Sequence, residues 1–107
     1  MQQLIQVVTT TPSLKEAQDL SKEVLQSCLA ACAQIEAIES LYHWEGNINH
    51  DQEYRVIFKT RADYYAQLES LILQTHSYQV PQIIALPILN VSESYALWVL
   101  KETERGV

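Results

Sequence analysis

The sequence is short of cysteine, glycine and proline, and it has no long apolar run. Its 107 residues include 2 Cys, 2 Gly and 3 Pro, which excludes a disulfide scaffold and a low-complexity or collagen-like chain. No stretch approaches the ~20 apolar residues of a membrane span. The start, Met1-Gln2-Gln3, lacks the basic region of a signal peptide. We therefore predict a single domain over residues 1–107, cytoplasmic, with no membrane partner.

Positive charge is also scarce. There are 7 Lys and Arg against 13 Asp and Glu, for a formal net charge of −6, and the basic residues are scattered. A nucleic-acid partner requires clustered positive charge, so we predict none. An acidic surface attracts cations weakly. The 48% hydrophobic content is typical of a globular protein with a packed core.

The first third of the chain predicts a strand followed by a helix. Residues 4–10 are rich in β-branched side chains, which favour a strand. Ser13 and Glu16 have the spacing of a capping box, in which each side chain satisfies a free backbone N–H of the first turn. Apolar residues at helical spacing then predict a helix over residues 13–30.

The middle of the chain predicts a long hairpin and a second helix. Residues 33–45 have no helical period, and Gly46-Asn47 indicates a turn before the strand of residues 54–60. Apolar spacing from Tyr65 predicts a second helix that ends near His76.

A last strand and a short helix complete the pattern. Residues 83–89 are almost wholly apolar, and Pro87 places this strand at a sheet edge because proline cannot donate to the ladder. Ser92 is the expected N-cap of a C-terminal helix. The order β-α-β-β-α-β-α predicts an α+β, ferredoxin-like antiparallel sheet with an added C-terminal helix.

Apolar side chains occupy both faces of the predicted sheet. Val56 and Phe58 point to one face and Ile57 to the other, and residues 83–86 are apolar throughout. Long hairpin arms also leave strand edges exposed. Both features favour self-association. The alternative is that the C-terminal helix covers the second face by itself.

Several motifs, in order and in register, resemble the CutA divalent-cation tolerance family. They are Leu29-Ala30-Ala31-Cys32, Tyr42-His43-Trp44-Glu45-Gly46-Asn47-Ile48, Lys59-Thr60, His76-Ser77-Tyr78-Gln79-Val80-Pro81-Gln82-Ile83 and Trp98. The resemblance covers about residues 4 to 103. It implies a ferredoxin-like subunit in a tight homotrimer, with strands of neighbouring subunits joined at their edges, and a connection to copper and other divalent cations.

The sequence departs from the family pattern at three positions. Ser77 stands where proline usually follows the motif histidine, Gln82 replaces a common glutamate, and Thr9 replaces a cysteine proposed to bind metal in some members. His76 matches the family motif and is the predicted metal residue. Because a carboxylate and a thiol are missing, we expect copper(II) or another divalent cation to bind weakly.

The other candidate metal residues fit structural roles better. Cys28 and Cys32 are four apart and could share a helix face, where they are expected to be small buried side chains; a metal or redox role stays open. His43 and His50 follow no ligand spacing. We expect His50 to be solvated and His43 to lie at an interface.

Aromatic and polar residues on two strands suggest a cleft between subunits. Tyr42 and Trp44 share one strand face, and Glu53 lies on the neighbouring strand. Aromatic walls with a few polar groups describe both ligand pockets and permanent interfaces. The full predicted set is Tyr42, Trp44, Glu53, Lys59, Tyr78 and Trp98.

No catalytic motif is present: the chain has no phosphate-binding glycine loop, no G-x-S-x-G and no H-E-x-x-H. The leading hypothesis is therefore a homotrimeric binding or signalling protein connected with divalent cations, and not an enzyme. One alternative is a catalyst in the intersubunit cleft that uses Lys59, Glu53 or Tyr78 for acid–base chemistry. The other is a structural or adaptor trimer that anchors a protein partner of unknown identity.

Overall fold

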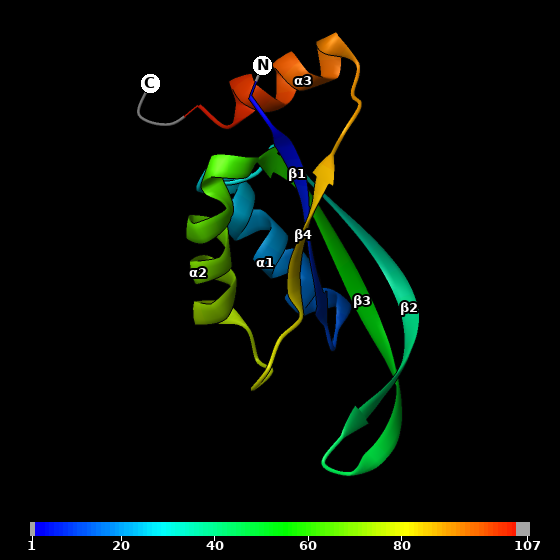
Figure 1. Ribbon diagram of the computed structural model, residues 1–107. Helices are drawn as coiled ribbons and strands as arrows, with labels where there is room; N and C mark the ends of the chain where they lie inside the picture. Colours follow the sequence, from blue (N-terminus) through cyan, green and yellow to red (C-terminus); the bar gives the residue numbers. More distant parts are fainter. Residues whose placement is uncertain (1, 105–107) are drawn as a thin grey trace.

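The computed structural model describes residues 2–104 as a four-stranded antiparallel sheet with α1 and α2 side by side on one face (Figure 1). The elements are β1 (Leu4–Thr11), α1 (Leu14–Gln26), β2 (Cys32–Trp44), β3 (Asn47–Arg61), a short 3-10 turn (Ala62–Tyr64), α2 (Tyr65–Thr75), β4 (Ile83–Ile88) and α3 (Glu93–Glu102). The strand order is β2-β3-β1-β4. The ferredoxin-like α+β prediction is confirmed.

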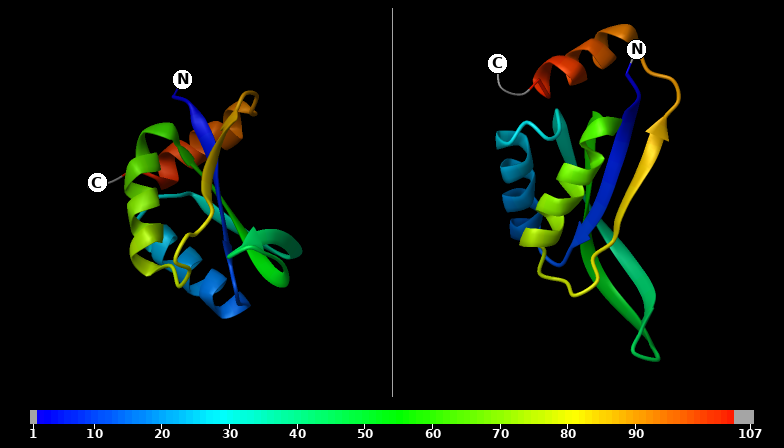
Figure 2. Two further views of the ribbon diagram at one scale, coloured as in Figure 1. Left: turned by 60° about the horizontal axis from the view of Figure 1, so that its bottom comes forward. Right: turned by 60° about the vertical axis from the view of Figure 1, so that its left-hand side comes forward.

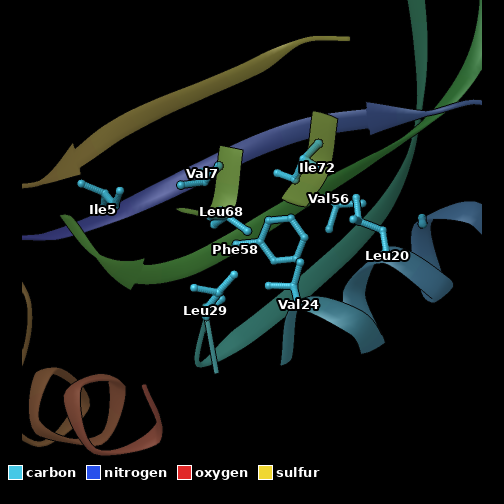
Figure 3. Close-up of a cluster of buried hydrophobic side chains, with 11 residues drawn as sticks. Ile5, Val7, Leu20, Val24, Leu29, Val56, Phe58, Leu68 and Ile72 are labelled. Atoms are coloured by element: carbon cyan, nitrogen blue, oxygen red, sulfur yellow. The ribbon is translucent and has the colours of Figure 1, made fainter. Parts of the chain in front are cut away.

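The core lies between the sheet and the two helices (Figure 3). Phe58 is fully buried at its centre, with Val7 from β1 and Val24 from α1. α2 contributes Leu68 and Ile72, which are four residues apart and so lie on one helix face. The sheet packs against the two helices through this core, and the long β2–β3 hairpin extends beyond it (Figure 1).

α1 ends earlier than the apolar spacing predicts. Ser27 caps the helix, and Cys28 takes a left-handed conformation with φ of 58°. The Cys28 N–H then donates to the Leu25 carbonyl at 3.0 Å and the Leu29 N–H to the Val24 carbonyl at 3.2 Å. These two bonds define a Schellman motif, which usually carries glycine at the left-handed position. Here cysteine occupies it, so the sequence gives no warning of the helix end.

The two cysteines therefore do not share a helix face, and that prediction is wrong. Cys28 lies in the turn after α1, whereas Cys32 is the first residue of β2. Both are free and half-buried. The Cys32 thiol lies 3.4 Å from the Tyr95 hydroxyl of α3, and burial together with this contact raises the pKa of Tyr95 to about 12.

The hairpin turn also lies one residue earlier than predicted. Trp44 pairs with Asn47, which leaves Glu45 and Gly46 as the two turn residues. Both have positive φ, 50° and 78°, as a two-residue type I′ hairpin turn requires. Gly46 fits this geometry without cost, while Asn47 begins β3.

β4 forms one edge of the sheet, as Pro87 predicts, and β2 forms the other. On the face opposite α1 and α2, the strand register places Ile84, Val8 and Ile57 in one row, with Leu86 two residues along β4. We call these four residues the open sheet face. Ile84 and Leu86 are 45% and 43% exposed.

α3 covers only one end of this second face. Its buried residues Ala96 and Val99 pack against Leu4, where β1 begins. The ribbon of α3 crosses that end of the sheet (Figure 2). Ser92 caps α3 by accepting the Tyr95 N–H, as predicted. The alternative in which the C-terminal helix covers the whole second face is therefore wrong for the isolated subunit. Within residues 2–104, no helix has both the length and the apolar character needed to cross a membrane.

Candidate functional site

A cleft of about 780 Å³ lies where the β2–β3 hairpin leaves the body of the sheet. One wall is the outer half of β2, and the other is the loop of residues 76–82 between α2 and β4. Its lining residues are Thr10, Glu39, Ser40, Leu41, Tyr42, His43, Trp44, Glu53, Ser77, Tyr78, Gln79, Val80 and Gln82. Four of the six predicted cleft residues are therefore brought together in one subunit.

Tyr42 and Trp44 supply the aromatic wall. They are two apart on β2, so strand alternation points both to the same face, opposite α1 and α2. The register pairs Ser40 with Asp51 and Tyr42 with Asn49. The Tyr42 hydroxyl reaches diagonally to donate a hydrogen bond to the Asp51 carboxylate. This bond raises the pKa of Tyr42, because ionising the phenol would place two negative charges in contact.

Glu53 is the buried acid of the cleft. Its exposure is 7%, and the Tyr78 hydroxyl donates to its Oε2 at 2.6 Å. Burial and then this bond raise the pKa of Tyr78 well above its ordinary value, so the phenol keeps its proton and remains a donor. Among the described residues, no Lys, Arg or His forms an ion pair with Glu53.

His76 fixes the loop that carries Tyr78. It ends α2 as the C-cap residue. Its Nε2 donates to the Thr10 carbonyl at 2.7 Å, and its Nδ1 accepts the Tyr78 N–H at 3.0 Å. A carbonyl can only accept and an N–H can only donate, so the bonds select the neutral imidazole with its proton on Nε2. His76 and Tyr78 are also in ring contact, with centroids 4.9 Å apart.

This arrangement does not support His76 as a metal ligand. The only free lone pair of a neutral imidazole is on Nδ1 here, and the Tyr78 N–H already occupies it. Across residues 2–104, no group of three or more His, Cys, Asp or Glu side chains is placed to share a metal ion. The residues present therefore do not fit a copper(II) site within one subunit.

Glu16 and Ser77 provide a second anchor for the same loop. The Ser77 N–H and hydroxyl both donate to the Glu16 carboxylate, at 3.0 and 2.9 Å. Half of the predicted capping box is confirmed, because the Ser13 hydroxyl accepts the Glu16 N–H at 3.1 Å. The other half is wrong: the Glu16 carboxylate bonds to Ser77, not back to Ser13. Serine at position 77 can make these two bonds, whereas proline could make neither.

We expect Ser77→Ala to lower the free energy of unfolding by about 1 kcal/mol, since one hydrogen bond to a partly solvated carboxylate is lost. Ser70→Ala on the exposed side of α2 is the control, because Ser70 only accepts a 3.5 Å contact from Gln74. Urea unfolding followed by circular dichroism measures both. Equal stability of the two variants would contradict a Glu16–Ser77 anchor.

Lys59 and Trp98 lie outside the cleft of a single subunit. Lys59 is six residues from Glu53 along β3, a separation of about 20 Å in a strand, and its Nζ donates to Gln34 at 2.6 Å. Trp98 is on α3, where it contacts the Tyr95 ring at 5.6 Å between centroids. Their predicted role between subunits concerns the assembly and stays a prediction.

The remaining histidines lie on the hairpin. His43 is exposed and lines the cleft. His50 is exposed, as expected, and its Nε2 lies 2.8 Å from Glu39 Oε1. Sequence reasoning gave no site role to Asp51, which accepts the Tyr42 hydroxyl, or to Glu16, which accepts two hydrogen bonds from Ser77. It also missed Thr10, whose carbonyl holds His76 at the start of the loop. Only the hairpin register could have indicated Asp51, since it lies opposite Ser40.

The geometry defines the class of protein: an α+β, ferredoxin-like subunit. Its distinguishing features are a long hairpin, an open sheet face and an aromatic, acidic cleft. Residues 5–102 match the family model described as CutA1 divalent ion tolerance protein. The chain belongs to this family.

Individual relatives agree along almost the whole length. The chain is 37% identical over 102 residues to the divalent-cation tolerance protein CutA of Pyrococcus horikoshii, covering 95% of this chain and 100% of that one. It superposes with a TM-score of 0.93 and 35% identity on the periplasmic divalent cation tolerance protein CutA from Archaeoglobus fulgidus, covering 94% and 99% of the two chains. For CutA1 from Oryza sativa the TM-score is 0.93 at 34% identity, covering 97% and 96%.

Proposed function

We propose that the chain works as a homotrimer that binds a small ligand in the cleft beside Glu53 and Tyr78. The observation that carries the proposal is the open sheet face. Ile84 and Leu86 are exposed there in the single subunit, beside the half-buried Ile57 and the buried Val8, and α3 does not cover them. Burying such a surface against a second copy gains about 25 cal/mol per Å² of apolar area.

The two sheet edges support a closed ring. β2 and β4 are different strands, each with one unpaired side, and an unpaired edge invites pairing with another chain. Pairing of β2 in one copy with β4 in the next is a head-to-tail contact, which closes into a ring when the rotation allows. Three subunits is the number that the family resemblance implies.

Binding fits the cleft better than catalysis. The acid–base alternative needs Lys59, Glu53 or Tyr78 near one reacting atom, and Lys59 lies far along β3 and bonds to Gln34. Glu53 and Tyr78 are locked to each other. Aromatic walls with a few fixed polar groups are typical of a ligand pocket.

The connection to divalent cations comes from the family. Weak binding of copper(II) would need ligands from more than one subunit, because no group of three or more ligating side chains is gathered among residues 2–104. The Tyr78 N–H also occupies the free lone pair of His76. Calorimetric titration with copper(II) tests whether the wild type binds the ion and whether His76→Ala changes that binding. A cytoplasmic location and an adaptor role toward a protein partner stay predictions.

Light scattering after gel filtration tests the assembly. We expect a mass about three times that of the 12.3 kDa chain, about 37 kDa, because closed symmetric oligomers are the usual form. A monomer or a dimer at micromolar concentration would overturn the proposal.

A further inference from the structure

We propose that the ligand of the cleft is a protonated organic amine. This inference rests on the proposed function, since it names the chemical class that the same cleft would take. Three properties of the lining carry it: a buried carboxylate without an ion-pair partner among the described residues, aromatic walls, and the absence of Lys and Arg from the described residues that line the cleft in one subunit.

The charge of the cleft comes from Glu53. This carboxylate is 7% exposed, and its one hydrogen bond from the described residues is donated by the neutral Tyr78 hydroxyl to Oε2. A buried charge without a counter-charge is costly, because burial removes its hydration. The second oxygen, Oε1, is left as a hydrogen-bond acceptor. A cationic N–H donor reaching Oε1 would supply both the missing positive charge and a charge-assisted bond.

The other acidic groups around the cleft are already engaged. Glu39 Oε1 lies within hydrogen-bond distance of His50 Nε2, at 2.8 Å, and Asp51 accepts the Tyr42 hydroxyl. The hydroxyls of Tyr42 and Tyr78 thus both donate their hydrogen bonds to carboxylates. Each phenol oxygen can still accept a hydrogen bond from a donor on the ligand. Glu53 is therefore the carboxylate that a ligand would neutralise.

The aromatic walls distinguish an organic cation from a bare metal ion. Trp44 and Tyr42 are 41% and 39% exposed, so part of each side chain is accessible. A cation over a Trp or Tyr ring face is attracted by the ring quadrupole. A metal ion needs several ligating groups at short distance, and no such group is gathered among residues 2–104. A volume of about 780 Å³ also lies in the range of small-molecule sites, roughly 300–1,000 Å³.

Spermidine, tetramethylammonium and Mg²⁺ are the probes that test this inference, by calorimetric titration of the full-length protein at fixed ionic strength. Spermidine carries N–H donors on a cationic chain, tetramethylammonium carries charge without N–H, and Mg²⁺ carries charge without an organic surface. We expect saturable spermidine binding that weakens as salt is raised, with both other probes binding at least tenfold less tightly.

Matched variants locate the binding. Glu53→Gln removes the charge while keeping an amide oxygen near Tyr78, and we expect at least tenfold weaker spermidine binding. Glu102→Gln, at the exposed end of α3, makes the same change in net charge and should leave binding unchanged. Trp44→Leu, at a position that is 41% exposed in the single subunit, removes the aromatic ring and should weaken binding severalfold.

The outcomes separate this inference from the assembly. No saturable spermidine binding, equal losses in Glu53→Gln and Glu102→Gln, or equal affinity for tetramethylammonium or Mg²⁺ would overturn the amine assignment. Light scattering on the same samples reports the trimer independently. If the protein is a trimer that does not bind spermidine, only the proposed ligand class is overturned. If it is a monomer that binds spermidine through Glu53, only the proposed trimer is overturned.

Discussion

Leu86→Glu should convert the trimer into folded monomers. Leu86 lies on the open sheet face and is 43% exposed in the single subunit, so a glutamate there can reach water and the monomer fold should survive. In the assembly the same carboxylate would be buried in an apolar interface without a partner. An uncompensated buried charge costs about 3–5 kcal/mol. This cost would lower the stability of the assembly once for every subunit.

The measurement is light scattering across a concentration series, with circular dichroism to confirm that each variant is folded. Leu73→Glu is the matched control, because Leu73 is 53% exposed on α2, which packs on the opposite face of the sheet. The control should keep the trimer mass. If Leu86→Glu remains trimeric, the open sheet face is not the contact between subunits.

Topology could be read from the sequence because it depends on patterns that repeat over many residues. The β-branched run of β1, the alternation in β3 and Pro87 at the sheet edge all predicted elements that the structure contains. The predicted order and type of the elements stay correct even when their bounds are wrong by one or two residues. The core follows from them, since Phe58 and Val56 share the face that alternation assigns.

Element ends were predicted less well because they depend on single residues in unusual conformations. Cys28 and Glu45 are the two non-glycine residues with positive φ among those described. Each occupies a position where glycine would be expected to mark a helix end or a turn. A sequence that places other residues there hides the boundary, which is why α1 was predicted too long and the hairpin turn one residue late.

The cleft was predicted in part for a similar reason. Strand alternation correctly grouped Tyr42 with Trp44. It could not tell how far along β3 the cleft of one subunit extends, and Lys59 lies beyond that cleft. The predicted place of Lys59 between subunits stays a prediction. The contacts of the loop could not be predicted from the sequence. Glu16 and Ser77 are hydrogen-bonded although they are 61 positions apart in sequence, and His76 and Thr10 although they are 66 apart. Pairings of that range depend on how the helices pack, which no local pattern encodes.

Two buried threonines should respond in opposite directions to the same substitution. Thr9 and Thr60 are both fully buried, and both lie on the strands that carry the core. The Thr60 hydroxyl donates to the Leu29 carbonyl at 2.7 Å, whereas the Thr9 hydroxyl has no hydrogen-bond partner among the described residues. Valine has nearly the shape of threonine and lacks the hydroxyl, so each substitution tests that group alone.

Thr60→Val should lower the free energy of unfolding by about 1–3 kcal/mol, because it removes the bond and leaves the Leu29 carbonyl without this donor. Thr9→Val should raise it by about 1 kcal/mol, because burying a hydroxyl without a partner is unfavourable. Since about 1 kcal/mol shifts Tm by roughly 4–8 °C in a domain of this size, the two variants should be clearly separated. Both must be compared with the wild type at one chain concentration, because assembly makes Tm concentration-dependent. If Thr9→Val destabilises the protein as much as Thr60→Val, the Thr9 hydroxyl has a hydrogen-bond partner such as a bound water. The hydroxyl would then contribute to stability.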